Sequence, residues 1–274
     1  MSETEPSARA VFSSLLERVR RQKPVVHHLT NWVTIYDCAQ IVKALGASPV
    51  MAHAPEEVAD MAQIASALVM NIGTLTVEFV ESMKLAARAA NERNIPVVLD
   101  VCGAGATRLR DQKCQELLGA AKIGIIKGNA SEIARISGEN VTTRGVDATE
   151  VSGDLVLLAQ KLARQRGATV VVTGKVDIVT DATQTFLVSN GHAMMTQVVG
   201  TGCMAASVIG AFAAVEPDLP LAAASALASY EIAAEVAAES SAGPGSFKVR
   251  LFDCLFNLDR PTIEKRAKVV KREA

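Results

Sequence analysis

Val199-Gly200-Thr201-Gly202-Cys203 is a glycine-rich turn that leads directly into a run of small and aliphatic residues, 204–211. We expect a helix to begin near residue 202. Glycines before a helix leave backbone N–H groups uncovered, and the helix N-terminus adds partial positive charge at the same place. The turn therefore predicts an anion site, above all for a phosphate group, and so indicates phosphoryl transfer. The Cys203 thiol stands in this field, where a cysteine is more reactive than an ordinary buried thiol.

Composition narrows the class of protein. The chain has 274 residues, a net charge of −1, and 49% hydrophobic residues with one Trp and two Tyr. The near-neutral charge argues against nucleic acid or an anionic membrane surface as a partner. The largely aliphatic residues suit a sheet that is covered by helices. Without a linker, repeat or low-complexity segment, we expect one domain over residues 1–274, with residues 1–8 and 262–274 as mobile tails.

The cysteines point to a reducing compartment. They are odd in number, widely spaced and without a C-x-x-C pair, so neither a disulfide framework nor a zinc site is predicted. The five are Cys38, Cys102, Cys114, Cys203 and Cys254. The polar, acidic N-terminus is unlike a signal peptide, and no apolar run reaches the roughly 20 residues of a membrane span. We therefore expect a cytoplasmic protein with no membrane partner.

Strand and helix patterns alternate along most of the chain. Apolar stretches that end at glycine or polar residues predict strands near 25–29, 48–51, 67–71, 95–100, 123–127 and 169–174. Helices are predicted over 9–21, 34–45, 76–93 and 152–166, with another that opens near residue 55, and they dominate from 202 onward. This order predicts a mainly parallel α/β sheet with helices on both faces. Short strands near 177–181 and 184–189 predict an antiparallel hairpin at one edge.

Ligands of open parallel sheets bind beyond the carboxyl ends of the strands. This rule selects Asn71 with Gly73, Asp100, Lys127 with Asn129, Thr173 with Gly174, and the turn 200–203. Asp100 ends an apolar strand, where a carboxylate can reach Mg²⁺ bound to nucleotide phosphates. The alternative is an aspartate that caps the following turn. The sequence leaves both interpretations of Asp100 open.

The other strand-end residues also have two interpretations. Asn129 and Glu132 can hold a metal through its waters, but their spacing is also that of an N-cap with a glutamate at N3, which is the commoner arrangement. Lys127 can meet a phosphate or be a solvated surface lysine. Thr173 can contact a nucleotide or simply end its strand. Cys203 can be a small buried hydrophobe at a helix start.

Two nucleotide-binding signatures are missing. The chain has no Walker A loop, and the loop Gly103–Thr107 lacks the third glycine of a dinucleotide fingerprint and the acidic residue about 20 positions on. These absences weaken the P-loop interpretation and exclude an NAD-dependent oxidoreductase. The four histidines show no metal-binding spacing, so we expect them to be structural or polar contacts.

Eight short motifs occur in an order that resembles the hydroxyethylthiazole kinase family of thiamine biosynthesis, over about residues 25–250. The motifs are Thr30-Asn31, Ala44–Met51, Glu57–Met61, Asn71–Leu75, Gly103–Thr107, Gly128–Ile133, Gly200–Cys203 and Gly243–Phe247. Within the larger ribokinase-like superfamily, Leu-Gly-Ala-Ser-Pro-Val-Met at 45–51 and Asn-Ile-Gly-Thr-Leu at 71–75 are specific to this family.

The resemblance implies a ribokinase-like fold and phosphorylation of 4-methyl-5-(2-hydroxyethyl)thiazole with ATP and Mg²⁺. It also implies a homotrimer with active sites between subunits. Carried over by motif, the resemblance implies a thiazole site formed by Met51, Gly200, Asn31, Asn71 and Gly73. It implies ATP contacts from Lys127, Thr173 and Asn129, and contacts to the metal and phosphates from Asp100 and Glu132. It also implies that Thr201, Gly202 and Cys203 form the anion hole and supply the catalytic group. Cys203 stands where ribokinase-like sugar kinases usually place an aspartate base.

Two positions depart from the family pattern, and we expect activity despite both. Lys127 stands where the family commonly has arginine, so a bidentate phosphate contact becomes monodentate. The segment Asp100-Val101-Cys102-Gly103 stands where the family commonly has Asp-Pro-Val-Gly. A loose phosphoryl-transfer transition state has little need of a general base. We therefore expect Cys203 to orient the substrate hydroxyl and to accept its proton late, without a covalent intermediate.

Two other functions remain open. One is a kinase for a related hydroxymethyl compound, such as the pyrimidine half of thiamine, which the Met51 segment disfavours. The other is a non-catalytic nucleotide-binding sensor on the same fold. The presence of Asp100, Glu132 and the whole 200–203 turn argues against a sensor.

Overall fold

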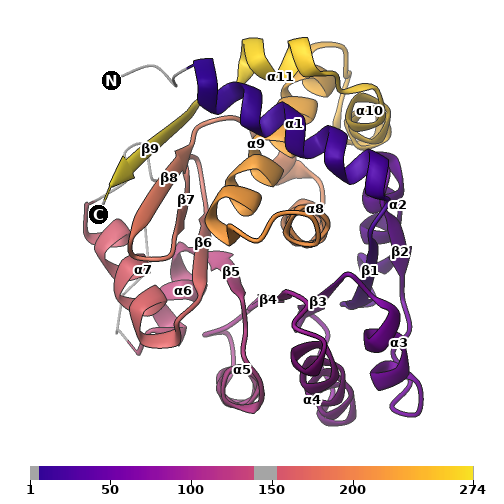
Figure 1. Ribbon diagram of the computed structural model, residues 1–274, viewed down its shortest axis with the longest axis vertical. Helices are drawn as coiled ribbons and strands as arrows, with labels where there is room; N and C mark the ends of the chain where they lie inside the picture. The colour runs from indigo at the N-terminus through magenta and orange to yellow at the C-terminus, as the bar shows by residue number, and fades with distance from the viewer. Residues whose placement is uncertain (1–5, 139–152, 274) are drawn as a thin grey trace.

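A nine-stranded sheet runs through the computed structural model, which describes residues 6–138 and 153–273 (Figure 1). Its strand order is β2-β1-β3-β4-β5-β6-β7-β8-β9. Neighbours from β2 to β6 are parallel, and those from β6 to β9 are antiparallel. The strands are β1 Val25–Leu29, β2 Ser48–Val50, β3 Ala67–Asn71, β4 Val97–Asp100, β5 Ile125–Asn129, β6 Thr169–Thr173, β7 Asp177–Thr180, β8 Gln184–Val188 and β9 Val269–Glu273. The predicted parallel sheet and its antiparallel hairpin are confirmed.

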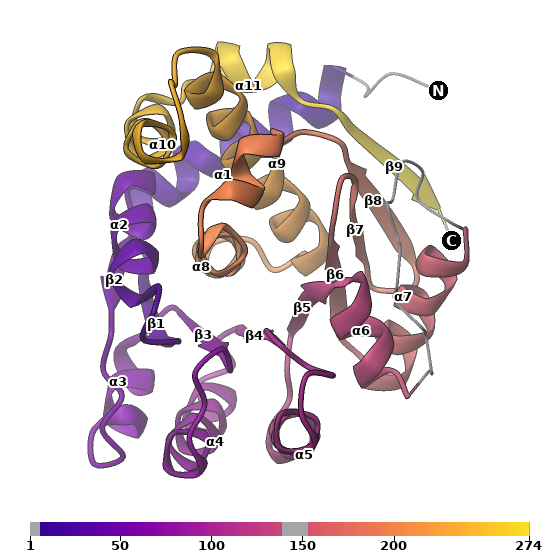
Figure 2. The ribbon, with the colours of Figure 1, turned by 180° about the vertical axis from the view of Figure 1, so that it is seen from behind.

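Helices cover both faces of this sheet, and Figure 2 shows the two helix layers from behind. One layer contains α1 Pro6–Gln22, α2 Ile35–Leu45, α8 Thr201–Ala213, α9 Leu219–Glu239, α10 Pro244–Asn257 and α11 Arg260–Arg266. The other contains α3 Val58–Ile64, α4 Val77–Glu92, α5 Arg108–Ala120, α6 Ala130–Ile136 and α7 Gly153–Arg166. A short 3₁₀ helix, η1 Ala193–Gln197, precedes α8. Sequence analysis gave no helix for α5, which is largely charged and lacks a continuous apolar stripe.

Successive strand residues face opposite hydrophobic cores, as the pleat requires. Val69 of β3 belongs to the core under α8 and α9, whereas Leu68 and Met70 belong to the core under α4 and α5. Both faces are therefore buried. This explains why the central strands are almost entirely apolar rather than alternating.

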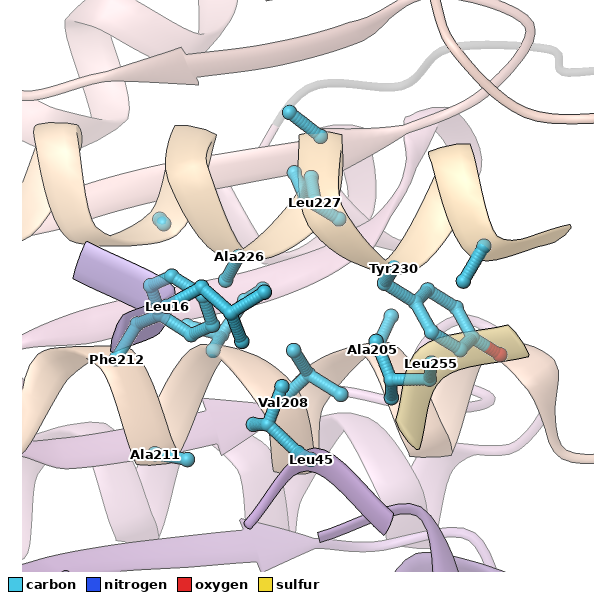
Figure 3. Close-up of a cluster of buried hydrophobic side chains, with 14 of the residues drawn as sticks. Leu16, Leu45, Ala205, Val208, Ala211, Phe212, Ala226, Leu227, Tyr230 and Leu255 are labelled. Atoms are coloured by element: carbon cyan, nitrogen blue, oxygen red, sulfur yellow. The ribbon is translucent and has the colours of Figure 1, made fainter. Parts of the chain in front are cut away.

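Helix α8 lies between the sheet and an outer layer of helices. Figure 3 shows the side chains of α8 and those that pack around them. The α8 residues are Ala205, Val208, Ala211 and Phe212, and their neighbours are Ala226, Leu227 and Tyr230 of α9, Leu16 of α1, Leu45 of α2 and Leu255 of α10. At the sheet side, a Cβ on Gly210 would lie 2.4 Å from Val69 Cγ2. The helix can approach β3 this closely only because residue 210 has no side chain.

Helix α9 is also a core element. In the described part of the chain it is the one helix long and apolar enough to cross a membrane by length and composition. However, 78% of its apolar window is buried inside the fold, against α8, α10 and α1. Its hydrophobicity is therefore explained by packing within the protein.

The prediction of a mobile tail over 262–274 is wrong for the residues that the structure describes. Arg260–Arg266 form α11, and Val269–Glu273 form β9, which pairs with β8 from Val188↔Val269 to Gln184↔Glu273. The lysines and arginines of this segment do not exclude an edge strand, because such a strand needs only alternate residues buried, and Val269 is buried. At the other end, α1 begins at Pro6, and residues 1–5 and 274 lie outside the described residues.

Buried His28 makes stability depend on pH. Burial lowers its pKa from the ordinary 6.5 to about 4, so native His28 remains neutral where the unfolded chain already binds a proton. The free energy of unfolding should therefore fall as the pH drops through this window. We expect His28 to account for a loss of about 2 kcal/mol between about pH 7 and pH 5, measured by urea denaturation. His27, whose pKa is also lowered by burial, adds to the same slope.

The variant His28→Asn should lose the His28 share of this pH dependence, whatever its absolute stability. His192 is exposed, so His192→Asn is a matched control that should keep the full slope. An unchanged slope in His28→Asn would contradict this account.

Candidate active site

The glycine-rich turn forms the N-terminus of α8, as predicted. Gly200 is the N-cap residue and has a left-handed backbone, with φ 94°. The helical ladder begins at Met204, whose N–H donates to the carbonyl oxygen of Gly200 at 2.8 Å. The N–H groups of residues 201–203 precede this first bond. Together with the helix dipole, these uncovered N–H groups favour an anion at this turn.

Gly200 lies against the residue that precedes α2. A Cβ at position 200 would be 2.4 Å from Thr34 Cγ2. The backbone N–H and the hydroxyl of Thr34 both donate to Asn31 Oδ1, at 3.1 and 3.0 Å. Positive φ and close approach both require glycine at position 200. The contact fixes α8 relative to Asn31 at the end of β1.

Two buried asparagine amides are directed at the Cys203 sulfur. Asn31 Nδ2 donates to Asn71 Oδ1 at 3.0 Å and lies 3.2 Å from Cys203 Sγ. Asn71 Nδ2 lies 3.4 Å from the same sulfur. Asn71 Oδ1 also accepts the Gly73 N–H at 2.8 Å, which closes the turn after β3. The structure thus brings together Asn31, Asn71, Gly73 and Cys203, which come from the end of β1, the end of β3 and the start of α8.

This environment lowers the pKa of Cys203 to about 5. The largest cause of the lowered pKa is a hydrogen bond from the Cys102 thiol. Burial raises the pKa and so opposes this shift. The Thr34 hydroxyl, the positive charge of Lys127 and the Asn31 amide lower the pKa further. The pKa of Cys102 is correspondingly raised. These contacts favour the thiolate form of Cys203, which can accept a proton as a neutral thiol cannot.

A buried ion pair lies beside the anion turn. Lys127 Nζ donates to Asp100 Oδ2 at 3.2 Å, and the two residues are only 3% and 2% exposed. Burial raises the pKa of Asp100 to about 7, while the charge of Lys127 opposes this shift. Burial also lowers the pKa of Lys127, but the charges of Asp100, Glu132 and Cys203 outweigh it, so the pKa is raised and the ammonium persists. The alternative of a solvated surface lysine is wrong.

Lys127 faces the anion turn as well as Asp100. A Cβ on Gly202 would be 3.7 Å from Lys127 Nζ. The ammonium group thus lies next to the uncovered N–H groups at the start of α8. A full positive charge and the helix dipole therefore act on the same small volume.

Asn129 and Glu132 form the capping box that the sequence left open as an alternative to a metal site. Asn129 Oδ1 accepts the Glu132 N–H at 2.9 Å, and Glu132 Oε2 accepts the Asn129 N–H at 2.7 Å. Glu132 Oε1 accepts a third bond, from the Gly103 N–H at 2.7 Å. Among the described residues, no group of three or more His, Cys, Asp or Glu side chains is arranged to hold a metal. A metal here would be bound largely through water and phosphate oxygens.

A pocket of about 640 Å³ opens beside the anion turn, on the side of β6 and the hairpin. Its lining includes the predicted residues Thr173, Gly174, Thr201 and Gly202. A volume of this size is typical of small-molecule and cofactor sites. A ligand that placed its phosphates at the start of α8 would extend into this pocket.

Two buried carboxyl groups form one wall of this pocket, and sequence analysis selected neither. Asp177 of β7 and Glu231 of α9 are 3% and 7% exposed. Asp177 Oδ2 and Glu231 Oε2 have no hydrogen-bond partner among the described residues, whereas Asp177 Oδ1 accepts the Gly174 N–H at 2.8 Å. Burial raises the pKa of both carboxyls, and the negative charge of Asp177 adds to the shift of Glu231.

Arg110 of α5 is a second residue that sequence analysis missed. Its Nη1 donates to the carbonyl oxygens of Ile72 and Cys102, at 2.8 and 3.1 Å, and its Nη2 donates to that of Gly73, at 2.7 Å. One guanidinium group therefore ties the turn after β3 to the loop after β4. The contact joins residues far apart in the sequence, and no local pattern marks it.

The structure places the predicted residues Met51 and Thr201 in the loop after β2 and at the first position of α8. Met51 follows β2, which β1 and β3 separate from β4. The loop that carries it is tied to β1, because His27 Nε2 lies 2.7 Å from the carbonyl oxygen of Ala52. The Thr201 hydroxyl donates to the carbonyl oxygen of Met195 at 3.0 Å, so it shapes the turn, and only the backbone of Thr201 is left for an anion.

Replacing Gly200 tests the geometry of the turn. Gly200→Ala should lower the free energy of unfolding by roughly 2 kcal/mol or more, because the left-handed backbone and the Thr34 contact both penalise a Cβ. Thermal unfolding measures this loss. Gly245→Ala is the control, since a Cβ there meets open space. Equal stability of Gly200→Ala and Gly245→Ala would contradict the geometry.

Comparison with known proteins identifies the family of this chain. The model of the hydroxyethylthiazole kinase family matches residues 16–261. A hydroxyethylthiazole kinase of Methanosarcina mazei is 56% identical, over 93% of this chain and 97% of that protein. The structure of a hydroxyethylthiazole kinase protein from Pyrococcus horikoshii has a TM-score of 0.88 and 42% identity, over 96% of this chain and 99% of that one. A ribokinase-like superfamily protein from Enterococcus faecalis shares the fold, with a TM-score of 0.58 and 15% identity, over 93% of this chain and 84% of that one. This chain belongs to the hydroxyethylthiazole kinase family.

Proposed function

We propose that this protein transfers the γ-phosphoryl group of ATP to the hydroxyl of 4-methyl-5-(2-hydroxyethyl)thiazole, in thiamine biosynthesis or salvage. One observation carries the assignment of roles. Cys203 stands at the uncovered start of α8, with the amides of Asn31 and Asn71 on one side and the Lys127 ammonium on the other. The thiazole belongs on the asparagine side, toward Met51. The nucleotide belongs in the pocket with Thr173, and a cytoplasmic location agrees with five free thiols.

Positioning and charge stabilisation account for the chemistry. The acceptor hydroxyl lies at Cys203 Sγ, in line with the γ-phosphate. The N–H groups of residues 201–203 and the Lys127 ammonium receive the negative charge of the transferring group. Cys203, held by the two asparagine amides, orients the hydroxyl and accepts its proton as the new O–P bond forms. No bond between sulfur and phosphorus is needed.

Mg²⁺ is the metal that this reaction implies, and it would neutralise charge on the nucleotide phosphates. Asp100 and Glu132 fit that role through the waters of the ion. Asp100 is a carboxylate at a strand end, and its Lys127 partner leaves it a second oxygen. Glu132 is held in place by the N–H groups of Gly103 and Asn129, so its carboxylate is fixed but already partly satisfied. Asn129, as the cap of α6, orients this carboxylate toward the phosphate region.

The reaction is tested by ADP release with the thiazole alcohol, the thiamine pyrimidine alcohol, or neither. We expect Mg²⁺-dependent ADP release with the thiazole, and loss of release on chelation. Cys203→Ala should lower kcat on the order of 10²-fold, because one aid to proton transfer is lost. Cys203→Asp should keep or raise kcat, since a carboxylate is also a base.

The alternatives give different outcomes in the same assay. Turnover with the pyrimidine alcohol alone would assign the related kinase, and ATP binding without any turnover would assign a sensor. A phosphorylated Cys203 peptide trapped during turnover would contradict the orienting role of the thiol.

We further propose a homotrimer with active sites between subunits. Large apolar side chains are exposed on both sides of the site: Trp32, Val33, Tyr36 and Val199 are 46%, 66%, 70% and 73% exposed. A patch of this kind typically marks a protein interface. The patch adjoins Asn31 and Gly200, so a subunit that covered it would also close the thiazole side of the site.

Sedimentation equilibrium tests the trimer. We expect three chains per particle for the unaltered protein and dissociation for Tyr36→Glu, because a carboxylate buried in an apolar interface is strongly disfavoured. Leu157, on α7, is similarly exposed at 60%, so Leu157→Glu is a matched control that should remain trimeric. A monomeric unaltered protein would overturn this proposal.

A further inference from the structure

The side chain of Arg110 bridges two turns at the carboxyl end of the sheet, one after β3 and one after β4. Its Nη2 donates to the Gly73 carbonyl oxygen at 2.7 Å, and its Nη1 donates to those of Ile72 and Cys102 at 2.8 and 3.1 Å. All three acceptors are main-chain oxygens. The guanidinium group therefore holds the backbone of the two turns, whatever side chains they carry.

The helix that carries Arg110 does not itself favour an arginine there. Arg110 lies in the first turn of α5, where its N–H donates to Oγ1 of the N-cap residue Thr107 at 3.3 Å. A positive charge at a helix N-terminus opposes the helix dipole. However, only arginine offers a planar fork of donors that can meet three carbonyl oxygens at once. Contacts with the two turns, not the helix, therefore account for arginine at this position.

The turn after β3 is connected to the Cys203 sulfur. The Gly73 N–H donates to Asn71 Oδ1 at 2.8 Å, and Asn71 Nδ2 lies 3.4 Å from Cys203 Sγ. Gly73 is the same residue whose carbonyl oxygen Arg110 holds. One peptide unit on each side of Gly73 therefore connects the guanidinium group to the amide that faces the sulfur.

The loop after β4 is connected to the candidate metal ligands. It begins directly after Asp100, and the Gly103 N–H donates to Glu132 Oε1 at 2.7 Å. Gly103 also packs against Arg110, since a Cβ on this glycine would lie 3.0 Å from Arg110 Nη1. The guanidinium group thus holds this loop between the two carboxyl groups.

We propose that Arg110 is a positioning residue for phosphoryl transfer, which couples the turn that faces the acceptor hydroxyl to the loop that serves the metal and phosphates. The catalytic consequence rests on the proposed function, whereas the coupling of the two turns does not. In-line transfer depends on the distance between acceptor and phosphate, so a tie between their two halves of the site acts on kcat. Each half keeps its own contacts without Arg110, so substrate binding changes little.

Kinetics of Arg110 variants test the catalytic part. Arg110→Ala should lower kcat for thiazole-dependent ADP release on the order of 10²-fold, because a small misplacement of the reactants is costly. The KM values for ATP and for the thiazole alcohol should stay within about threefold, since the lost interaction is not one of binding. Arg110→Lys keeps the charge and the stem but not the fork, so it should restore kcat only in part.

Asn91 offers a matched control at the opposite edge of the sheet. It is half-buried, like Arg110, and lies near the end of α4, which leads to the start of β4. Its side chain also ties two segments through the main chain, with Nδ2 3.0 Å from the Lys122 carbonyl oxygen and Oδ1 2.6 Å from the Lys122 N–H. Asn91→Ala should therefore lower the melting temperature as Arg110→Ala does, but leave kcat unchanged.

Hydrogen exchange tests the coupling without catalysis. We expect the peptides that cover residues 71–75 and 101–106 to exchange faster in Arg110→Ala than in the unaltered protein, because both turns lose an anchor. The same peptides should be unaffected in Asn91→Ala. Mass spectrometry of the full-length proteins measures this difference.

Three outcomes would overturn the proposal. They are an unchanged kcat in Arg110→Ala, an equal loss of kcat in Asn91→Ala, and unchanged exchange in either of the two turns. An unaltered protein that never phosphorylates the thiazole would refute the proposed function instead. Faster exchange of both turns in Arg110→Ala would then still support their coupling by this residue.

Discussion

Helix α8 approaches its surroundings so closely that only glycine fits at two points of contact, and the site depends on this constraint. At Gly200 the neighbour is Thr34, and at Gly210 it is Val69 of β3, each at 2.4 Å from where a Cβ would be. The two contacts fix the height of the helix over the sheet and the position of its N-terminus. Because Cys203 follows Gly200 by less than one turn, its sulfur is carried to the ends of β1 and β3. The small residues that fill the helix thus meet a packing requirement that also positions Cys203.

Charge is concentrated around this helix start with little water to screen it. Asp100 and Lys127 are each other's partner in the buried site, and removal of either would leave an uncompensated buried charge. Glu132 and the Cys203 sulfur add negative charge around the same ammonium. Lys127 is therefore a cation with several anionic neighbours already in place. In the proposed reaction, phosphate oxygens would join this arrangement rather than create it, so the electrostatics would be preorganised.

The sequence predicted the parallel sheet, its hairpin and most of the cluster at the strand ends. Strand-end residues converge by topology alone, which is why Asn71, Lys127 and the turn 200–203 could be expected to meet, whereas Asn31 was named only through the family resemblance. The sequence could not decide whether Lys127 was buried, because a single lysine gives the same sequence pattern whether water or a helix covers it. It also could not find contacts between segments far apart in the chain, such as Arg110 with three carbonyl oxygens or Asp177 with Glu231. Strand β9 was not predicted, because its basic residues hide the alternating pattern of a strand in which Val269 faces the core.

The carboxyl pair in the pocket wall has a consequence for how a nucleotide enters. Burial raises the pKa of Asp177 and of Glu231, so this wall keeps its protons to a higher pH than two free carboxyl groups would. A triphosphate is strongly anionic, and each further negative charge on the wall would repel it across a medium that screens poorly. In the proposed function, the affinity for nucleotide would thereby be linked to the protonation of two groups that take no part in the bond being made.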